Sequence, residues 1–166
     1  MKRICTETGD EGETSLRDGV RVAKDDLRIE TNGQIDHLNA LLGVVRSMLP
    51  EGDAARELIH ATQRELMAVM SHVATPDGNV NPRPLHAVDL MQQMEQTIER
   101  TPVETGFVVP GDRSPLSAFI HLARTQTRTV ERRLWTLTRQ HPVDERILRM
   151  MNRLSDYLFV LAIEHA

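Results

Sequence analysis

The sequence lacks the features that mark several large classes of protein. Cys5 is the only cysteine among 166 residues, so an internal disulfide framework is excluded and a reducing compartment is expected. No apolar run approaches the roughly 18 residues that indicate a membrane-spanning helix. The start, Met1 to Cys5, has no apolar stretch of the kind found in secretory signals. Together these absences predict a cytoplasmic protein without a membrane segment.

Aromatic residues and an excess of positive charge are missing as well. Aromatic residues make up 3% of the chain, and the formal net charge is −4. A general nucleic-acid binder carries a basic surface and usually stacking aromatic residues, so nucleic acid is not expected as a partner. Positive charge is nevertheless concentrated in one segment, which predicts a local site for an anion. Its arginines are Arg124, Arg128, Arg132, Arg133, Arg139, Arg146, Arg149 and Arg153.

Helical periodicity is what the chain has in abundance. Apolar residues recur at helical spacing in five segments, over about 33–49, 53–73, 84–100, 114–141 and 144–164. Segments rich in proline and glycine separate them, and strand-like alternation is absent. The sequence therefore predicts one all-α domain over 1–166, a ferritin-like five-helix bundle at 32–166 preceded by an irregular N-terminal arm at 1–31.

The fourth predicted helix carries an ionic stripe beside its apolar face. Arg124, Arg128 and Glu131 are spaced i, i+4, i+7 and therefore share one side of the helix. The stripe is either an ion-paired flank or a fork for phosphate or carboxylate, which arginine suits by its geometry. Asn152 and Asp156 form a similar pair on the fifth helix, and Asp36 lies beside the core face of the first. These groups predict a cleft between helices or between subunits.

The segment TETGDEGETS at 6–15 is the second candidate site. Its glycines and hydroxyls suit a phosphate chain, whereas its four carboxylates repel one, and turn formation alone also explains the composition. It is not a Walker loop, because the required spacing of glycine and lysine is missing. Glu57 and His60 match one Glu-x-x-His unit of di-iron bundles, but the second copy is missing, so no protein metal site is predicted.

Six segments, in this order, resemble the PduO-type ATP:cob(I)alamin adenosyltransferases. They are TETGDEGETSL at 6–16, RVAKDDLRIE at 21–30, GQIDHLNALLG at 33–43, FVVPG at 107–111, LARTQTRTVERR at 122–133 and MNRLSDYLFVLA at 151–162. The resemblance implies transfer of the 5′-deoxyadenosyl group of ATP, bound with Mg²⁺, to the cobalt of a reduced corrinoid (cob(I)alamin), with triphosphate released. It further implies a five-helix homotrimer with active sites between subunits, served by a corrinoid reductase and supplying a B12-dependent enzyme.

The resemblance also assigns roles to individual residues. It implies an inter-subunit ion pair between Asp36 and Arg124, and it makes Phe107 an aromatic wedge that keeps the lower axial ligand off cobalt. With Arg128, these residues form the expected catalytic set. The expected ATP-binding residues are Thr6, Glu7, Thr8, Gly9, Thr14, Ser15, Lys24, Arg128, Glu131, Arg132 and Asn152.

The chain departs from the family pattern at several positions. Glu7 stands where a basic residue is common, His37 where glutamate is usual, and Thr129 where a second arginine is usual. We expect fewer positive charges near triphosphate to weaken ATP binding or to move catalysis, and we expect Arg113, in a loop one residue longer than usual, to restore part of that charge. We therefore keep an alternative beside the active enzyme: a catalytically impaired ATP- or corrinoid-binding paralogue that acts as a sensor or escort.

Overall fold

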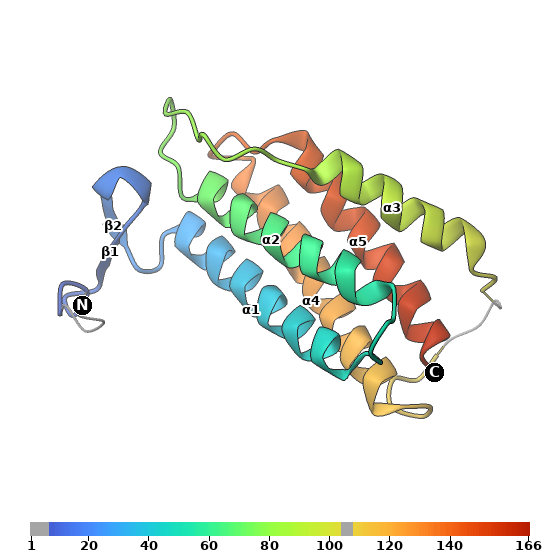
Figure 1. Ribbon diagram of the computed structural model, residues 1–166. Helices are drawn as coiled ribbons and strands as arrows, with labels where there is room; N and C mark the ends of the chain where they lie inside the picture. The colour runs from blue at the N-terminus through green and yellow to red at the C-terminus, as the bar shows by residue number, and fades with distance from the viewer. Residues whose placement is uncertain (1–6, 104–107) are drawn as a thin grey trace.

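Five α-helices and one short β-hairpin make up residues 7–103 and 108–166, which are the residues that the computed structural model describes (Figure 1). The hairpin comes first, and the helices follow in chain order. The elements are β1 (Glu13–Ser15), the 3₁₀ turn η1 (Arg17–Gly19), β2 (Arg21–Ala23), α1 (Leu27–Met48), α2 (Ala55–Val73), α3 (Ala87–Arg100), α4 (Pro115–Leu137) and α5 (Glu145–Glu164). The all-α five-helix bundle predicted from periodicity is confirmed.

Local sequence sets where three of the helices begin. Asp26, Ser114 and Asp144 precede α1, α4 and α5, and each side chain accepts a hydrogen bond of 2.8–2.9 Å from a backbone N–H two or three residues later. Such caps satisfy amide groups that have no partner inside the helix. Pro115, at the first position of α4, has no N–H to satisfy there.

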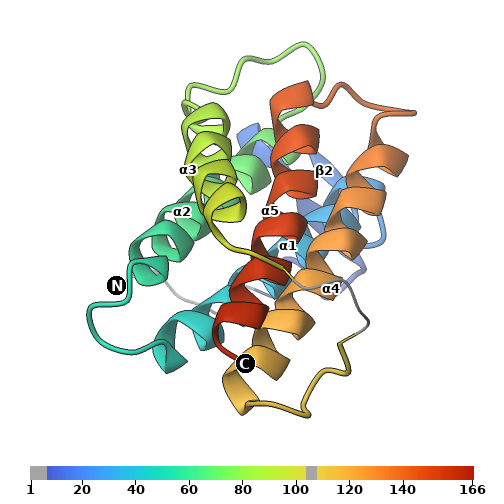
Figure 2. The same cartoon turned by 90° about the vertical axis from the view of Figure 1, so that its right-hand side faces the viewer.

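The core lies among all five helices, and α3 contributes Ala87, Leu90 and Met94 to it. Helix α4 packs between α1 and α5, α2 packs on α1, and α3 packs mainly on α5 (Figure 2). The apolar faces that meet there are fully buried and include Ile35, Leu38, Leu42, Ile59, Leu66, Ile120, Val130, Leu134, Met150, Leu154 and Leu158. Burying these side chains is the main term that stabilises the bundle.

The N-terminal arm is more ordered than predicted. Strands β1 and β2 pair antiparallel, with Thr14 opposite Val22, and the hairpin projects from one end of the bundle (Figure 1). Strands of three residues are too short to show alternation, so the prediction of an irregular arm missed them. Helix α1 also begins at Leu27, earlier than predicted. The polar sequence around Thr31 hid this first turn, in which the buried Thr31 hydroxyl donates to the Leu27 carbonyl at 2.7 Å.

Candidate functional site

One face of α4 carries the predicted ionic stripe and extends it by a turn. Arg124, Arg128 and Glu131 share this face because α4 is a continuous helix, and Trp135 follows four residues after Glu131. Arg128 is exposed, while Arg124 and Glu131 are half-buried. Trp135, the single tryptophan of the chain, leaves 54% of its surface exposed. The sequence interpretation passed over Trp135, although its spacing from Glu131 was a usable signal.

A pocket between α4 and α5 brings two of the expected ATP-binding residues together. Glu131 of α4 and Asn152 of α5 line it, together with Trp135, His141 and Arg149. Its volume is about 650 Å³, within the range of small-molecule sites. It combines a carboxylate, an amide, a cation and an aromatic face, which are groups able to hold a ribose, a phosphate and a base.

Arg124 is partly desolvated, and no carboxylate of residues 7–103 and 108–166 forms an ion pair with it. Its Nε donates to Nδ1 of His121 at 3.3 Å, and its guanidinium carbon lies 5.9 Å from the ring centroid of Phe159. Burial and then the charge of Arg128 lower the pKa of Arg124, and the group remains a cation. A half-buried cation beside a second cation favours the approach of an anion or a carboxylate from outside the chain.

Asp36 does not meet Arg124 within the described residues. Asp36 is exposed on α1, and no ion pair or hydrogen bond of its side chain forms among residues 7–103 and 108–166. The contacts of Arg124 there are those to His121 and Phe159. Asp36 and Arg124 therefore have no ionic partner among the described residues of one chain, which leaves both free for the inter-subunit pair that the resemblance implies.

The arm forms two consecutive turns beneath Lys24. Asp10 N–H donates to the Glu7 carbonyl and Gly12 N–H to the Gly9 carbonyl, both at 3.3 Å. A Cβ added at Gly9 would lie 3.3 Å from Nζ and Cε of Lys24, so glycine lets the ammonium group lie close to the loop. Lys24 N–H also donates to the Gly12 carbonyl at 2.9 Å. The expected contacts Gly9 and Lys24 thus lie together, with the positive charge of Lys24 close to the backbone of the loop.

Arg21 is a residue of the arm that the sequence interpretation missed. Its guanidinium donates to the Thr8 carbonyl at 2.9 Å and to the Ser15 hydroxyl at 3.2 Å, and it lies 3.5 Å from a carboxylate oxygen of Glu13. Arg21 therefore supplies a cation beside two expected ATP-binding residues. Its place opposite Ser15 depends on the hairpin register, which the sequence did not reveal.

Glu7 lies in the same hollow as Arg21. The hollow measures about 670 Å³ and is lined by Glu7, Thr8, Asp10, Glu11, Ser15 and Arg21. The backbone of Glu7 is left-handed, at φ 59°, a conformation that residues with a side chain rarely adopt. The hollow thus contains three carboxylates, which repel phosphate, so the structure does not remove the conflict that the sequence showed.

The remaining predicted residues are spread over the structure. The α4–α5 pocket and the arm hollow share no lining residue, so one chain does not join them into one cavity. Thr14 is half-buried in β1, and Arg132 is exposed, with Nη2 donating to the Thr129 hydroxyl at 3.2 Å. Thr6 and Phe107 lie outside the described residues.

Residues 7–103 and 108–166 contain neither a preformed metal site nor a membrane-spanning helix. No group of three or more histidine, cysteine, aspartate or glutamate side chains there is arranged to hold a metal ion. Likewise, none of the helices in those ranges has the length and apolar character needed to cross a bilayer.

The fold and these two hollows define a five-helix-bundle protein with a candidate nucleotide-binding arm. The model of the cobalamin adenosyltransferase family matches residues 4–165, and the chain belongs to that family.

Known relatives agree with this assignment. A corrinoid adenosyltransferase of Citrobacter freundii is 37% identical, over 98% of this chain and 94% of its own, and one of Mycobacterium leprae is 35% identical, over 98% and 90%. Among solved structures, a variant PduO-type ATP:corrinoid adenosyltransferase from Lactobacillus reuteri, complexed with cobalamin and ATP, superposes with a TM-score of 0.83. It is 27% identical, and the match covers 96% of this chain and 91% of that one.

Proposed function

We propose that the chain transfers the 5′-deoxyadenosyl group of ATP to the cobalt of a reduced corrinoid, cob(I)alamin, giving adenosylcobalamin and triphosphate. Membership of the family over nearly the whole chain supports this activity. So does the similarity to a solved relative that is complexed with both cobalamin and ATP. Within the chain, the observation that carries the proposal is the meeting of Glu131 and Asn152, from two helices, in one pocket of nucleotide size.

The reaction asks for alignment and charge neutralisation. The electron pair of Co(I) forms the bond to the 5′-carbon of ATP, while the bond from that carbon to the triphosphate oxygen breaks and its electrons leave with the triphosphate. Because Co(I) is itself a strong nucleophile, the protein needs no general base. It has to hold the 5′-carbon in line between cobalt and the leaving group, and to stabilise the charge that develops on that group.

The residues of the arm and of α4 suit these tasks. We assign phosphate binding to the Thr8 and Ser15 hydroxyls, to the loop at Gly9 and to Lys24, whose ammonium group lies close to that loop. Arg128, exposed beside Glu131, neutralises the leaving triphosphate, and Mg²⁺ bound with ATP would supply further positive charge there. Glu131 and Asn152 hold the nucleoside in the α4–α5 pocket.

A homotrimer with sites between subunits completes the proposal. In it, Asp36 of one subunit pairs with Arg124 of the next. This pairing is supported by the half-buried position of Arg124 beside a like charge and by the lack of an ionic partner for Asp36 among the described residues. Assembly from several chains also provides a way to join the arm hollow to an α4–α5 pocket.

Other parts of the proposal rest on the family pattern. Phe107 acts as the aromatic wedge that displaces the lower axial ligand of the corrinoid. The enzyme works in the cytoplasm, receives its corrinoid from a reductase and passes its product to a B12-dependent enzyme. The departure at Glu7 is accommodated by Lys24 and Arg21, the two cations placed beside the turns of the arm.

An anaerobic assay tests the activity. The protein is incubated with ATP, Mg²⁺ and chemically reduced cobalamin, and the absorption spectrum is followed before and after illumination. A photolabile cobalt–carbon product that forms only with ATP and active protein supports the proposal. Binding of ATP or corrinoid without product identifies the impaired paralogue instead. If neither ligand binds, both the active enzyme and the impaired paralogue are contradicted.

A further inference from the structure

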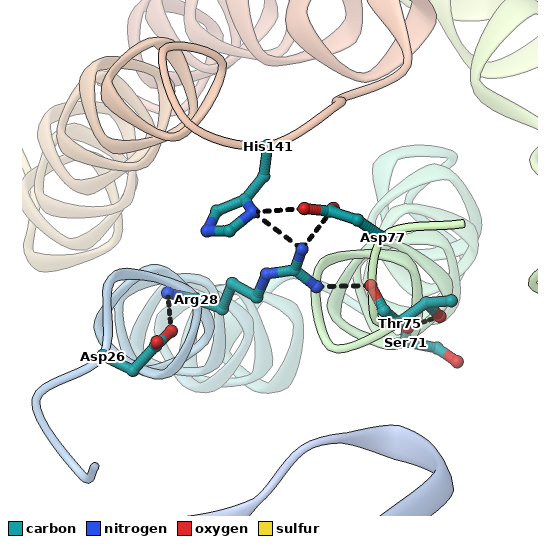
Figure 3. Close-up of polar contacts among 6 residues, drawn as sticks. All are labelled: Asp26, Arg28, Ser71, Thr75, Asp77 and His141. Carbon is teal, nitrogen blue, oxygen red and sulfur yellow. Dashed lines mark hydrogen bonds and ion pairs between the residues drawn. The ribbon is translucent and has the colours of Figure 1, made fainter. Parts of the chain in front are cut away.

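A buried arginine connects three parts of the structure at the end of the bundle nearest the hairpin (Figure 3). Arg28, in the first turn of α1, is only 4% exposed. Its guanidinium donates to the Thr75 carbonyl and to the Asp77 carboxylate, both in the loop between α2 and α3. His141, in the loop between α4 and α5, places Nδ1 2.8 Å from Arg28 Nη2 and 2.8 Å from Asp77 Oδ2.

Each polar side chain of the network has a partner within it. Unprotonated Nδ1 of His141 accepts from Arg28, and protonated Nδ1 donates to Asp77, so the ring has a partner in either state. The hydrogen bond from His141, followed by the charge of Arg28, lowers the pKa of Asp77 and keeps this carboxylate ionised at neutral pH. A buried guanidinium needs such partners, because an unpaired buried charge is costly.

The same loop between α2 and α3 contacts the arm. Arg17 N–H, in η1, donates to the Ala74 carbonyl at 2.9 Å, and Asn79 donates to the Asp18 carboxylate at 3.1 Å. Residues 74–79 therefore contact both the arm, through Ala74 and Asn79, and Arg28, through Thr75 and Asp77.

On its other side the network borders the α4–α5 pocket. His141, Pro142 and Val143 line both that pocket and a smaller cavity of about 140 Å³, which Arg28 and Asp77 line from the opposite side. The loop that carries His141 is thus a shared wall: one surface contacts the Arg28 network, and the other bounds the space where Glu131 and Asn152 meet.

We propose that Arg28, acting through Asp77 and His141, is a positioning residue for nucleotide binding. It fixes the wall of the α4–α5 pocket and ties that wall, through residues 74–79, to the arm. The inference rests on the proposed function. A wall that is loose before ATP arrives has to be ordered on binding, which weakens affinity. Arg128 and Lys24 are untouched by the network, so the chemical step keeps its rate once ATP is bound.

Asp77→Ala is the sharpest test, because Asp77 does not line the α4–α5 pocket and contacts the wall of that pocket through His141. We expect KM for ATP to rise about ten- to hundredfold, the usual effect of losing a hydrogen bond to a charged group, with kcat within about twofold of the parent value. Hydrogen exchange of segment 138–144 in the free protein should increase. His141→Ala should raise KM as well, and the double variant should be no worse than the more affected single variant.

Glu95→Gln is the matched control, since it weakens a 2.9 Å ion pair with Arg153 that joins α3 to α5 away from this loop. Its KM for ATP should stay that of the parent. The positioning role is overturned if folded Asp77→Ala keeps the parent KM for ATP. It is also overturned if the main effect of the substitution is a loss of kcat. The two proposals fail in different assays. If the parent protein shows no turnover, the proposed function is refuted. If hydrogen exchange of segment 138–144 is unchanged in Asp77→Ala, the positioning role of the network is refuted, whatever the turnover of the parent.

Discussion

Reversing the charge of Asp36 tests the proposed trimer directly. Asp36 is exposed and makes no ionic contact among the described residues, so Asp36→Arg should leave the fold of a single chain unchanged. In the trimer, the new cation would face Arg124, which already lies next to Arg128 and is partly desolvated. We therefore expect a loss of assembly without a loss of helix content.

The size of the effect follows from the burial of the pair. Two unit charges 4 Å apart near a protein surface attract by about 4 kcal/mol, and desolvation of the half-buried Arg124 offsets part of this. A net loss of about 2 kcal/mol per interface is at the lower end for a truncated interfacial pair. Summed over the three interfaces of a trimer, the loss is about 6 kcal/mol. The dissociation constant of a trimer into three monomers has units of concentration squared, so the concentration at which half of the protein is dissociated follows its square root. That concentration therefore rises about 150-fold.

Sedimentation velocity over a dilution series measures that concentration. The double variant Asp36→Arg with Arg124→Asp should recover much of the assembly, because the pair is restored with its signs exchanged. Glu99→Arg changes the charge by the same amount on an exposed position of α3 and should assemble like the parent. If Asp36→Arg assembles as Glu99→Arg does, or if the double variant recovers nothing, the inter-subunit pair is refuted.

Two other residues lead to predictions of different kinds. Arg128→Ala should lower kcat/KM for adenosyl transfer about 10²- to 10³-fold, because it removes a donor to the charge that develops on the triphosphate. Arg128→Lys should recover part of this loss. A near-parental kcat/KM of Arg128→Ala in the anaerobic assay would rule out the triphosphate role. Burial raises the pKa of Glu65, so the folded state loses stability as pH rises from the ordinary pKa through the raised one. Glu65→Gln keeps an acceptor for His86 N–H and removes this loss. Its melting temperature should therefore exceed the parent's at pH 8, by about 2–4 °C per kcal/mol, and match it near pH 4, whereas a difference independent of pH would contradict the assignment.

The helices and part of the site were predictable from the sequence because their causes are local. The spacing of Arg124, Arg128 and Glu131 places them on one side of α4 wherever that helix lies. Ser114 and Pro115 mark the start of α4 through capping, which needs only neighbouring residues. The family resemblance also rests on motifs of adjacent residues, which is why it assigned the chain before any tertiary contact was known.

Contacts between distant segments could not be predicted in this way. Asp77 lies 49 residues from Arg28 and 64 from His141, and neither separation carries a periodic signal. Arg21 reaches Thr8 and Ser15 only because two strands of three residues pair in a particular register. Even the pocket that joins Glu131 to Asn152 depends on how α4 packs against α5.

The sequence by itself determined the five helices, their apolar faces, the ionic stripe of α4 and the family, because backbone geometry and short motifs act within a few residues. The tertiary structure decided which of these features meet. It placed Glu131 and Asn152 in one pocket, Lys24 over Gly9, and the buried Arg28 between two loops. The first and last of those placements follow from the packing of whole helices to bury apolar surface, and the second follows from the turns and strand pairing of the arm.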